Sequence, residues 1–188
     1  MTTDRAAPGA WAALREDFRA NAPGLGLGAG PAALLRATAR NAPTVRFLAV
    51  ALLRLAQGAG ARVALLGSLV KQLNHVLTGA DLAYQARIGP GLVLYHPTGV
   101  VVGPGCVVGA RATLMQSVTL GSDEVVAGPE RAGSPRLGDD VFVGPGAAVF
   151  GDVVLGDRVQ VGANSVVTDS FGNDVVIAGA PARVVRER

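Results

Sequence analysis

A period of six residues runs through the second half of this chain and constrains its fold more than any other feature. From Ile88 to Val167, nine of eleven successive spacings between recurring aliphatic residues are six residues long. The aliphatic positions are 88, 94, 102, 108, 114, 120, 137, 143, 149, 155, 161 and 167. Six residues rotate a side chain by about 240° around an α-helix, so these residues would not share a helical face. In a strand, where side chains alternate, six residues return a side chain to the same face.

Glycine often follows the aliphatic position, and a mostly small residue comes four residues after it. Short strands joined by corners every six residues form a coil with three sides. Residues eighteen apart then stack, as we expect for Leu137 on Leu155 and Val143 on Val161. Glycine supplies corners that need a positive φ angle. Because one hexapeptide cannot bury its own apolar face, stability comes from stacking successive coils. We therefore predict a mainly β fold, a parallel β-helix of hexapeptide repeats.

Residues 1–79 follow a different pattern and are predicted to form an N-terminal α-helical region ahead of a β-helix domain at 80–188. The predicted helices, from their apolar spacing, are 11–19, 32–40, 44–56 and 62–77. Gly24–Gly30 is expected to be a linker, Gly58–Gly60 to separate the two longer helices, and Gly79 to end the last one. These two helices carry more apolar residues than one face needs, which a packed bundle or a subunit interface would explain.

Composition excludes several classes of protein. Collagen is excluded because the 26 glycines do not recur at every third residue. One cysteine and two histidines exclude a disulfide framework, a cysteine-based zinc site and a three-histidine metal site within one chain. The 17 basic residues, of which only Lys71 is a lysine, are scattered without interleaved aromatic residues. Nucleic-acid binding is therefore not expected, and neither is a metal cofactor.

Neither a secretory signal nor a membrane span is expected. Met1–Pro8 includes Asp4 and is not followed by an apolar segment. The apolar stretch 47–70 is interrupted by Arg54 and Arg62, which makes it a poor membrane span. A cytoplasmic, reducing location is the expectation.

The hexapeptide pattern resembles the left-handed parallel β-helix acyltransferases, and several motifs resemble the serine acetyltransferase branch of that family. The motifs include Ile88-Gly-Pro-Gly with His96-Pro-Thr-Gly, Gln116-Ser-Val-Thr-Leu-Gly121, Val161-Gly-Ala-Asn-Ser and Gly179-Ala-Pro-Ala-Arg183. The resemblance implies a left-handed coil, acetyl-CoA as co-substrate and a small-molecule hydroxyl acceptor. It also implies a homotrimer with each active site between two subunits, and it leaves open whether trimers pair into hexamers.

His96 is the candidate general base, since a neutral imidazole can accept the proton of an alcohol at cellular pH. It lies where the period is disturbed, because eight residues rather than six separate Leu94 from Val102. The extra residues should form a bulge that exposes a side chain. Asp81, fifteen residues earlier, is expected to orient the imidazole and stabilise its protonated form, as the resemblance also implies. The alternatives are a surface histidine and a loop aspartate without function.

The seventeen-residue spacing between Leu120 and Leu137 predicts an excursion loop at 121–136. Such a loop at a solenoid corner commonly serves function or an interface, and a surface loop without function is the alternative. The resemblance implies that this loop covers the acyl-donor and acceptor clefts, with Tyr95 and Ser134 on the acceptor side. The residues that it implies for the coenzyme are Gly121, Ser122, Gly144, Gly162, Ala163 and Arg183. Cys106 is at an inward small position and is expected to be packed rather than nucleophilic.

The acceptor-side residues depart from the serine acetyltransferase pattern. Tyr95 stands where the family has an aspartate, and Gly133–Pro135 lacks the family's histidine. No aspartate lies between Asp17 and Asp81 to bind the serine amine, and the sequence ends at Arg188 without the tail that binds a partner sulfhydrylase. Free serine is a zwitterion that needs charged partners. We therefore expect an O-acetyltransferase with another hydroxyl acceptor. A genuine serine acetyltransferase of cysteine biosynthesis and a non-catalytic β-helix scaffold are the alternatives.

Overall fold

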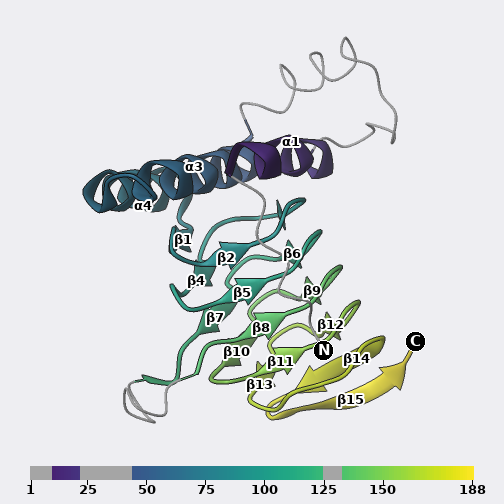
Figure 1. Cartoon of the computed structure of the whole chain (residues 1–188). Helices are drawn as coiled ribbons and strands as arrows, with labels where there is room; N and C mark the ends of the chain where they lie inside the picture. The colour runs from purple at the N-terminus through teal and green to yellow at the C-terminus, as the bar shows by residue number, and fades with distance from the viewer. Residues whose placement is uncertain (1–9, 22–43, 125–132) are drawn as a thin grey trace.

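In the computed structural model of this chain, residues 10–21, 44–124 and 133–188 are described. Helices lie across one end of a long stack of short strands, and the C-terminal hairpin lies at the other end (Figure 1). The linker expected at Gly24–Gly30, the helix expected at 32–40 and the middle of the excursion loop at 125–132 lie outside the described residues.

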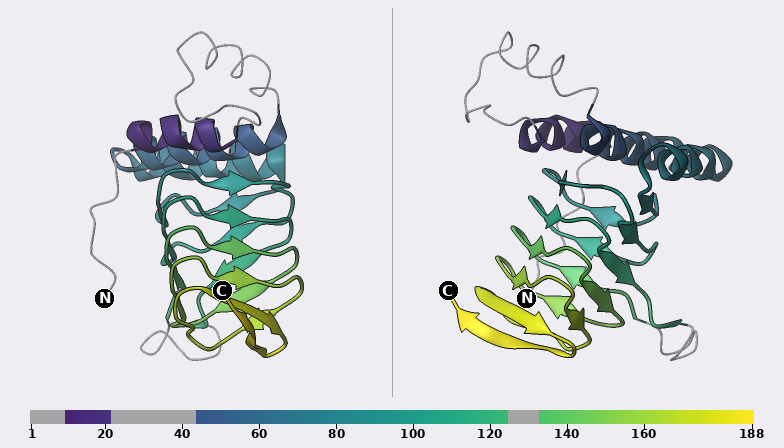
Figure 2. Two further views of the ribbon diagram at one scale, coloured as in Figure 1. Left: turned by 90° about the vertical axis from the view of Figure 1, so that its right-hand side faces the viewer. Right: turned by 180° about the vertical axis from the view of Figure 1, so that it is seen from behind.

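The strands form three sheets that wind around one axis, with one strand of each sheet in each of the first four coils. Sheet A contains β1 (Asp81–Leu82), β4 (Val101–Val102), β7 (Thr119–Gly121), β10 (Ala148–Phe150) and β13 (Val166–Val167). Sheet B contains β2 (Arg87–Ile88), β5 (Val107–Val108), β8 (Arg136–Leu137) and β11 (Val154–Leu155). Sheet C contains β3 (Val93–Leu94), β6 (Thr113–Leu114), β9 (Phe142–Val143), β12 (Gln160–Val161), β14 (Val175–Gly179) and β15 (Ala182–Glu187). Figure 2 shows one sheet face-on as a ladder of short strands. The predicted left-handed parallel β-helix is confirmed.

The register between coils records where residues are inserted at the corners. Undisturbed coils pair residues eighteen apart, as predicted for Leu137–Leu155 and Val143–Val161. Asp81 pairs with Val101, twenty residues on, because the corner with His96 is two residues longer. Thr119 pairs with Ala148, twenty-nine residues on, because the excursion loop adds eleven. The strands therefore stay paired on both sides of each insertion.

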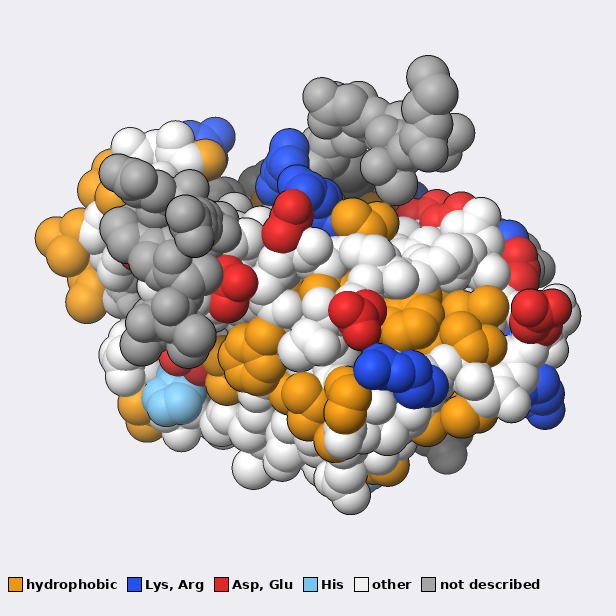
Figure 3. Space-filling view, turned by 90° about the horizontal axis from the view of Figure 1, so that it is seen from below, with side chains coloured by type: hydrophobic (Ala, Val, Ile, Leu, Met, Phe, Trp, Pro, Cys, Tyr) orange, Lys and Arg blue, Asp and Glu red, His pale blue; other side chains and the backbone are white. Residues whose placement is uncertain are grey.

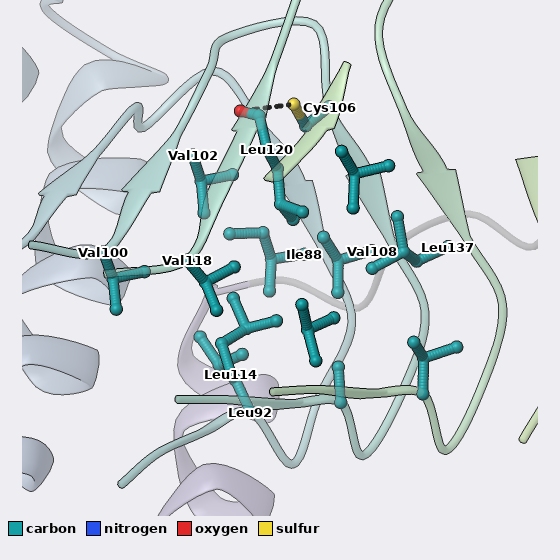
Figure 4. Packing of buried hydrophobic residues seen from close by; sticks show 14 of the residues in the cluster. Ile88, Leu92, Val100, Val102, Cys106, Val108, Leu114, Val118, Leu120 and Leu137 are labelled. Carbon is teal, nitrogen blue, oxygen red and sulfur yellow. Dashed lines mark hydrogen bonds between the residues drawn. The ribbon is translucent and has the colours of Figure 1, made fainter. Parts of the chain in front are cut away.

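The recurring aliphatic side chains point into the coil and form its core, as Figure 4 shows for Ile88, Leu114 and Leu120. Cys106 is buried among them, and its Sγ donates a hydrogen bond to the Leu120 carbonyl oxygen at 3.3 Å. Burial raises the pKa of the Cys106 thiol. The expectation that Cys106 is packed is therefore confirmed.

A column of residues with positive φ angles marks the B–C corner, where sheet B turns into sheet C. Its members alternate in charge down the stack, in the order Arg111, Asp140, Arg158, Asp174, with φ between 57° and 59°. The guanidinium of Arg111 donates to both carboxylate oxygens of Asp140, at 2.7 and 2.6 Å. Arg158 pairs with Asp174 in the same way. These bidentate pairs link neighbouring coils at positions where non-glycine residues are uncommon.

Three helices precede the β-helix among the described residues: α1 (Ala10–Ala20), α3 (Val45–Gly60) and α4 (Ala64–Thr78). The two longer helices are separate, as predicted, but the break lies at residues 61–63 and not at Gly58–Gly60, because α3 extends to Gly60. A Cβ at Gly60 would lie 2.5 Å from the Tyr84 ring, so this glycine allows close packing at the end of the helix. Gly79 ends α4 with φ 74°, as predicted. No helix in the described ranges is long and apolar enough to cross a membrane.

A buried charged network joins the helices to the first coil. The Arg54 side chain of α3 is 2% exposed and that of Asp17 of α1 is 0% exposed, and Arg54 Nε donates to Asp17 Oδ2 at 2.7 Å. Arg54 also donates to the carbonyl oxygens of Ile88 and Gly89, at 2.7 and 2.6 Å. One cluster of buried apolar residues includes members of both α3 and the β-helix. The division into domains at 79/80 remains a prediction.

Candidate active site

The C–A corner, where sheet C turns into sheet A, carries several of the predicted site residues in one column. In successive coils this corner consists of residues 95–100, 115–118, 144–147 and 162–165. His96 lies in the first of these segments, Gly144 in the third, and Gly162 and Ala163 in the fourth. Residues that are far apart in the sequence therefore share one edge of the β-helix.

His96 lies in a bulge of this corner. Tyr95 N donates to the Leu114 carbonyl oxygen at 3.3 Å, and Ser117 N donates to the Thr98 carbonyl oxygen at 3.1 Å. Between the paired positions Leu94–Leu114 and Val101–Thr119, the coil with His96 has two residues more than the next coil. The bulge leaves His96 exposed, and its imidazole makes no hydrogen bond with another described residue. The ring is thus available to a ligand, and its role stays a prediction.

Asp81 starts β1 directly beside the same corner. Its backbone N donates to the Val100 carbonyl oxygen at 2.8 Å, and Gly99 N donates to the Gly79 carbonyl oxygen at 2.9 Å. Its carboxylate Oδ1 lies 2.5 Å from Nζ of Lys71, which α4 supplies. Within the described ranges, no hydrogen bond joins the carboxylate to His96. The structure brings the two residues to one corner, and the proposed aspartate–histidine pair stays a prediction.

Tyr95 lies between the histidine and the helical region. Its side chain is 50% exposed, and the guanidinium carbon of Arg46 is 5.4 Å from the centre of its ring. Arg46 comes from the first turn of α3, and its Nη2 donates to the Asn21 carbonyl oxygen at 2.6 Å. No carboxylate pairs with this guanidinium in the part of the chain that the structure describes. A cation therefore lies beside the expected acceptor side, where the sequence indicated none.

The lower part of the column can accept a ligand through its backbone. Gly144 and Gly162 donate their N–H groups to the coil below, whereas the Ala163 N–H has no acceptor among the described residues. A Cβ at Gly144 would lie 2.8 Å from Ala163 N, so only glycine leaves this amide uncovered. Arg183 lies on β15, exposed, with Nη1 3.1 Å from Asp169 Oδ2. A free amide suits the amide-rich arm of coenzyme A, and the exposed guanidinium suits its phosphates.

Gly121, Ser122 and Ser134 lie at a different place, the A–B corner where sheet A turns into sheet B. The strands of sheet A, each two or three residues long, separate the two corners. The base of the excursion loop closes here, because Gly133 N donates to Asp123 Oδ1 at 2.9 Å. Ser122 Oγ accepts a hydrogen bond from Glu124 N at 3.1 Å. A single chain therefore holds these three residues and His96 at opposite edges of sheet A.

Comparison with known proteins agrees with this arrangement. Residues 134–169 match the family described as bacterial transferase hexapeptide (six repeats), and residues 99–128 match the hexapeptide repeat of succinyl-transferase. Soybean serine acetyltransferase, solved in complex with serine, is 31% identical with a TM-score of 0.79 over 95% of this chain and 70% of that one. This chain belongs to the serine acetyltransferase branch of the hexapeptide-repeat acyltransferases. The Neisseria gonorrhoeae serine acetyltransferase structure has a TM-score of 0.79 at 25% identity, covering 95% of this chain and 65% of that one.

Among curated members of the serine acetyltransferase branch, the Synechococcus elongatus enzyme is 36% identical over 124 residues, which are 66% of this chain and 50% of that protein. The Staphylococcus aureus (strain Mu50) enzyme is 35% identical over 119 residues, 63% of this chain and 54% of that protein. The chain spans about half the length of the curated relatives it matches.

Three residues near the C–A corner were not predicted from the sequence as site residues. Lys71 and Arg46 lie on helices, 25 and 50 residues before His96, and only the packing of the helices brings them to the corner. Gln116 lies one coil below the bulge, and its buried Oε1 has no hydrogen-bond partner among the residues that the structure describes. For Lys71 a signal was available in the sequence, because it is the single lysine of the chain.

Proposed function

We propose that this chain is an acetyl-CoA-dependent O-acetyltransferase in which His96 is the general base. The observation that carries the proposal is the exposed His96 in its bulge, at the head of a column that ends in the unpaired Ala163 N–H. Support comes from a related structure described as serine acetyltransferase in complex with CoA, with a TM-score of 0.76 at 27% identity over 95% of this chain and 70% of that one. The names of the curated relatives support the same activity.

In this mechanism His96 removes the proton from the acceptor hydroxyl as its oxygen attacks the thioester carbonyl. His96 then returns that proton to the departing thiolate sulfur, so the imidazole is neutral again after each cycle. Asp81 orients the ring and stabilises its protonated form. Backbone N–H groups near Gly121 or Ser122 hold the negative charge that develops on the carbonyl oxygen.

A homotrimer would bring the two separated groups together. The outward side of sheet A carries the exposed apolar residues Val101, Phe150 and Val166, whereas the outward side of sheet B carries Arg87 and Arg136. Burial of sheet A around a threefold axis would remove that apolar surface from water. In such a trimer, the C–A corner of one copy lies beside the A–B corner of the next. His96 would then meet Gly121, Ser122 and Ser134 of a neighbouring copy.

The outer face of α4 also suits a subunit interface. It carries exposed apolar side chains, namely Leu65, Leu66, Leu69, Leu73, Val76 and Leu77. Figure 3, a view from below, shows hydrophobic side chains at the surface on the left, where α3 and α4 project beyond the β-helix. Of the two explanations for the apolar surplus of these helices, a subunit interface is favoured. This surface also favours the second candidate function, a non-catalytic scaffold that recruits a partner.

The identity of the acceptor divides into two proposals. The relatives' names favour free serine, and the Arg46 guanidinium beside Tyr95 would suit a carboxylate. The loss of the family's acidic residue at Tyr95 and of its histidine at Gly133–Pro135 favours another small hydroxyl acceptor, because an ammonium group would lack a partner. We retain the second as our main proposal and free serine as the alternative.

Thiol release from acetyl-CoA tests the function directly. Turnover with L-serine is compared with turnover on a panel of neutral alcohols, which identifies the acceptor class. With the best acceptor, His96→Ala should lower kcat by about 100-fold or more. His75→Ala, which removes the other histidine, an exposed one on α4, should leave turnover unchanged. Normal thiol release by His96→Ala would exclude the mechanism, and failure to bind any acyl-CoA in calorimetry would favour the scaffold.

A further inference from the structure

The only lysine of this chain contacts the aspartate that the mechanism uses. The chain has 17 lysine and arginine residues, and Lys71 is the single lysine among them. Its Nζ is 2.5 Å from Oδ1 of Asp81. The two side chains come from separate elements, α4 and β1, which pack against each other. A residue type that the chain uses once thus lies at its candidate active site.

The inner face of α4 holds Lys71 in place. Asn74 and Thr78, on the same face of the helix, are buried. Asn74 Nδ2 donates to the Ala49 carbonyl oxygen at 2.9 Å, and Thr78 Oγ1 donates to the Asn74 carbonyl oxygen at 2.8 Å. The bond from Asn74 to α3 fixes the rotation of α4, and therefore the direction from which Nζ approaches Asp81. The pair itself is partly exposed, at 31% and 37%, and ion pairs this exposed contribute little to stability.

The choice of lysine over arginine has a chemical reason at this position. A carboxylate has two oxygens, and Lys71 occupies Oδ1 as a single point charge. Oδ2 of Asp81 has no partner within the described ranges, so it is available to an imidazole N–H. Arginine at this position would present a planar fork that binds both oxygens, as Arg111 does with Asp140. The lysine leaves one oxygen for His96, whereas an arginine would take both.

Few other charges face this pair. On α4 the remaining titratable side chain is His75, which is exposed, and strand β4 beside Asp81 consists of Val101 and Val102. The C–A corner contributes His96 and Tyr95, with Arg46 beyond the tyrosine ring. In the described part of the chain, Lys71 is the one cation that touches the carboxylate.

We propose that Lys71 is a positioning residue for catalysis, which holds the Asp81 carboxylate in place so that its second oxygen orients His96. The inference rests on the proposed function and adds a residue to it. The ammonium also offsets part of the carboxylate charge that His96 experiences. Without it, the full negative charge of Asp81 would face the ring.

Two substitutions separate this role from a structural one. Lys71→Met should lower kcat by about tenfold, leave KM for acetyl-CoA unchanged, and move the acid limb of the kcat/KM profile upward by about half to one pH unit. Lys71→Arg keeps the charge, so the acid limb should stay in place, while kcat falls because the guanidinium occupies both oxygens. Circular dichroism melting curves that match wild type would show that both variants are folded.

Asp81→Asn and His96→Ala distinguish failure of the inference from failure of the function. If both are inactive while Lys71→Met keeps the wild-type kcat and pH profile, the role of Lys71 is refuted and the function stands. If His96→Ala retains normal thiol release, the proposed function fails and this inference fails with it. A Lys71→Arg enzyme with wild-type kcat would refute the two-oxygen argument.

Discussion

The buried pair of Arg54 and Asp17 offers the sharpest test of how the helices hold the first coil. The five N–H groups of Arg54 all have acceptors: both carboxylate oxygens of Asp17, the Gln57 side-chain oxygen and the carbonyl oxygens of Ile88 and Gly89. Arg54→Met would preserve much of the side-chain volume and remove every one of these donors. The Asp17 carboxylate would then be a buried charge without a counter-ion, which costs about 3–5 kcal/mol.

A second substitution checks the cause of that loss. Asp17 Oδ1 also accepts hydrogen bonds from Gly91 N at 2.8 Å and Leu92 N at 2.9 Å. Asp17→Asn keeps an oxygen for these two donors and removes the orphaned charge. The double variant Arg54→Met with Asp17→Asn should therefore be more stable than Arg54→Met alone, by about 1–2 kcal/mol.

Urea unfolding followed by circular dichroism measures these differences, at several protein concentrations because assembly contributes to apparent stability. Arg136→Met is the matched control. Arg136 pairs with Asp152 on the surface, and the two side chains are 52% and 67% exposed. Its removal should change stability by less than about 1 kcal/mol. A loss below about 1 kcal/mol for Arg54→Met, or a double variant less stable than the single one, would refute the reasoning.

Three further outcomes are expected. Gly79→Ala should destabilise by about 1–2 kcal/mol in thermal unfolding because φ is 74° there, whereas Gly172→Ala, with open space at its Cβ, should be near neutral; equal effects would contradict this. Val166→Asp should convert the proposed trimer to monomers in light scattering and abolish thiol release; an unchanged mass would exclude sheet A as the interface. The Arg111 guanidinium lowers the pKa of Asp140, so this pair stabilises the fold above pH 3.8 and loses that effect as the pH falls below it. The stability difference between wild type and Arg111→Met should thus shrink on acidification, and a difference that grows would show the opposite linkage.

The coil could be predicted from sequence because each repeat places its own aliphatic residue and corner locally. The spacing around His96 and the excursion loop also predicted where the register would depart from eighteen residues. The exact end of α3 could not be predicted. Gly60 packs closely against the ring of Tyr84, which lies 24 residues later in the sequence, and no local pattern indicates that contact. Lys71 and Arg46 were missed for the same reason. Their positions depend on how helices without a repeat pack on the coil.

The residues inserted at the corners affect which parts of a β-helix of this kind can vary in sequence. Pairing resumes in register at Thr119–Ala148 despite the eleven added residues, so the strands place no limit on the length or composition of the segment between them. Under the proposed function, acceptor preference can thus change through that segment and through Tyr95 without altering the strand pairing. The ladder of the coil and the segments inserted at its corners can therefore change independently in evolution.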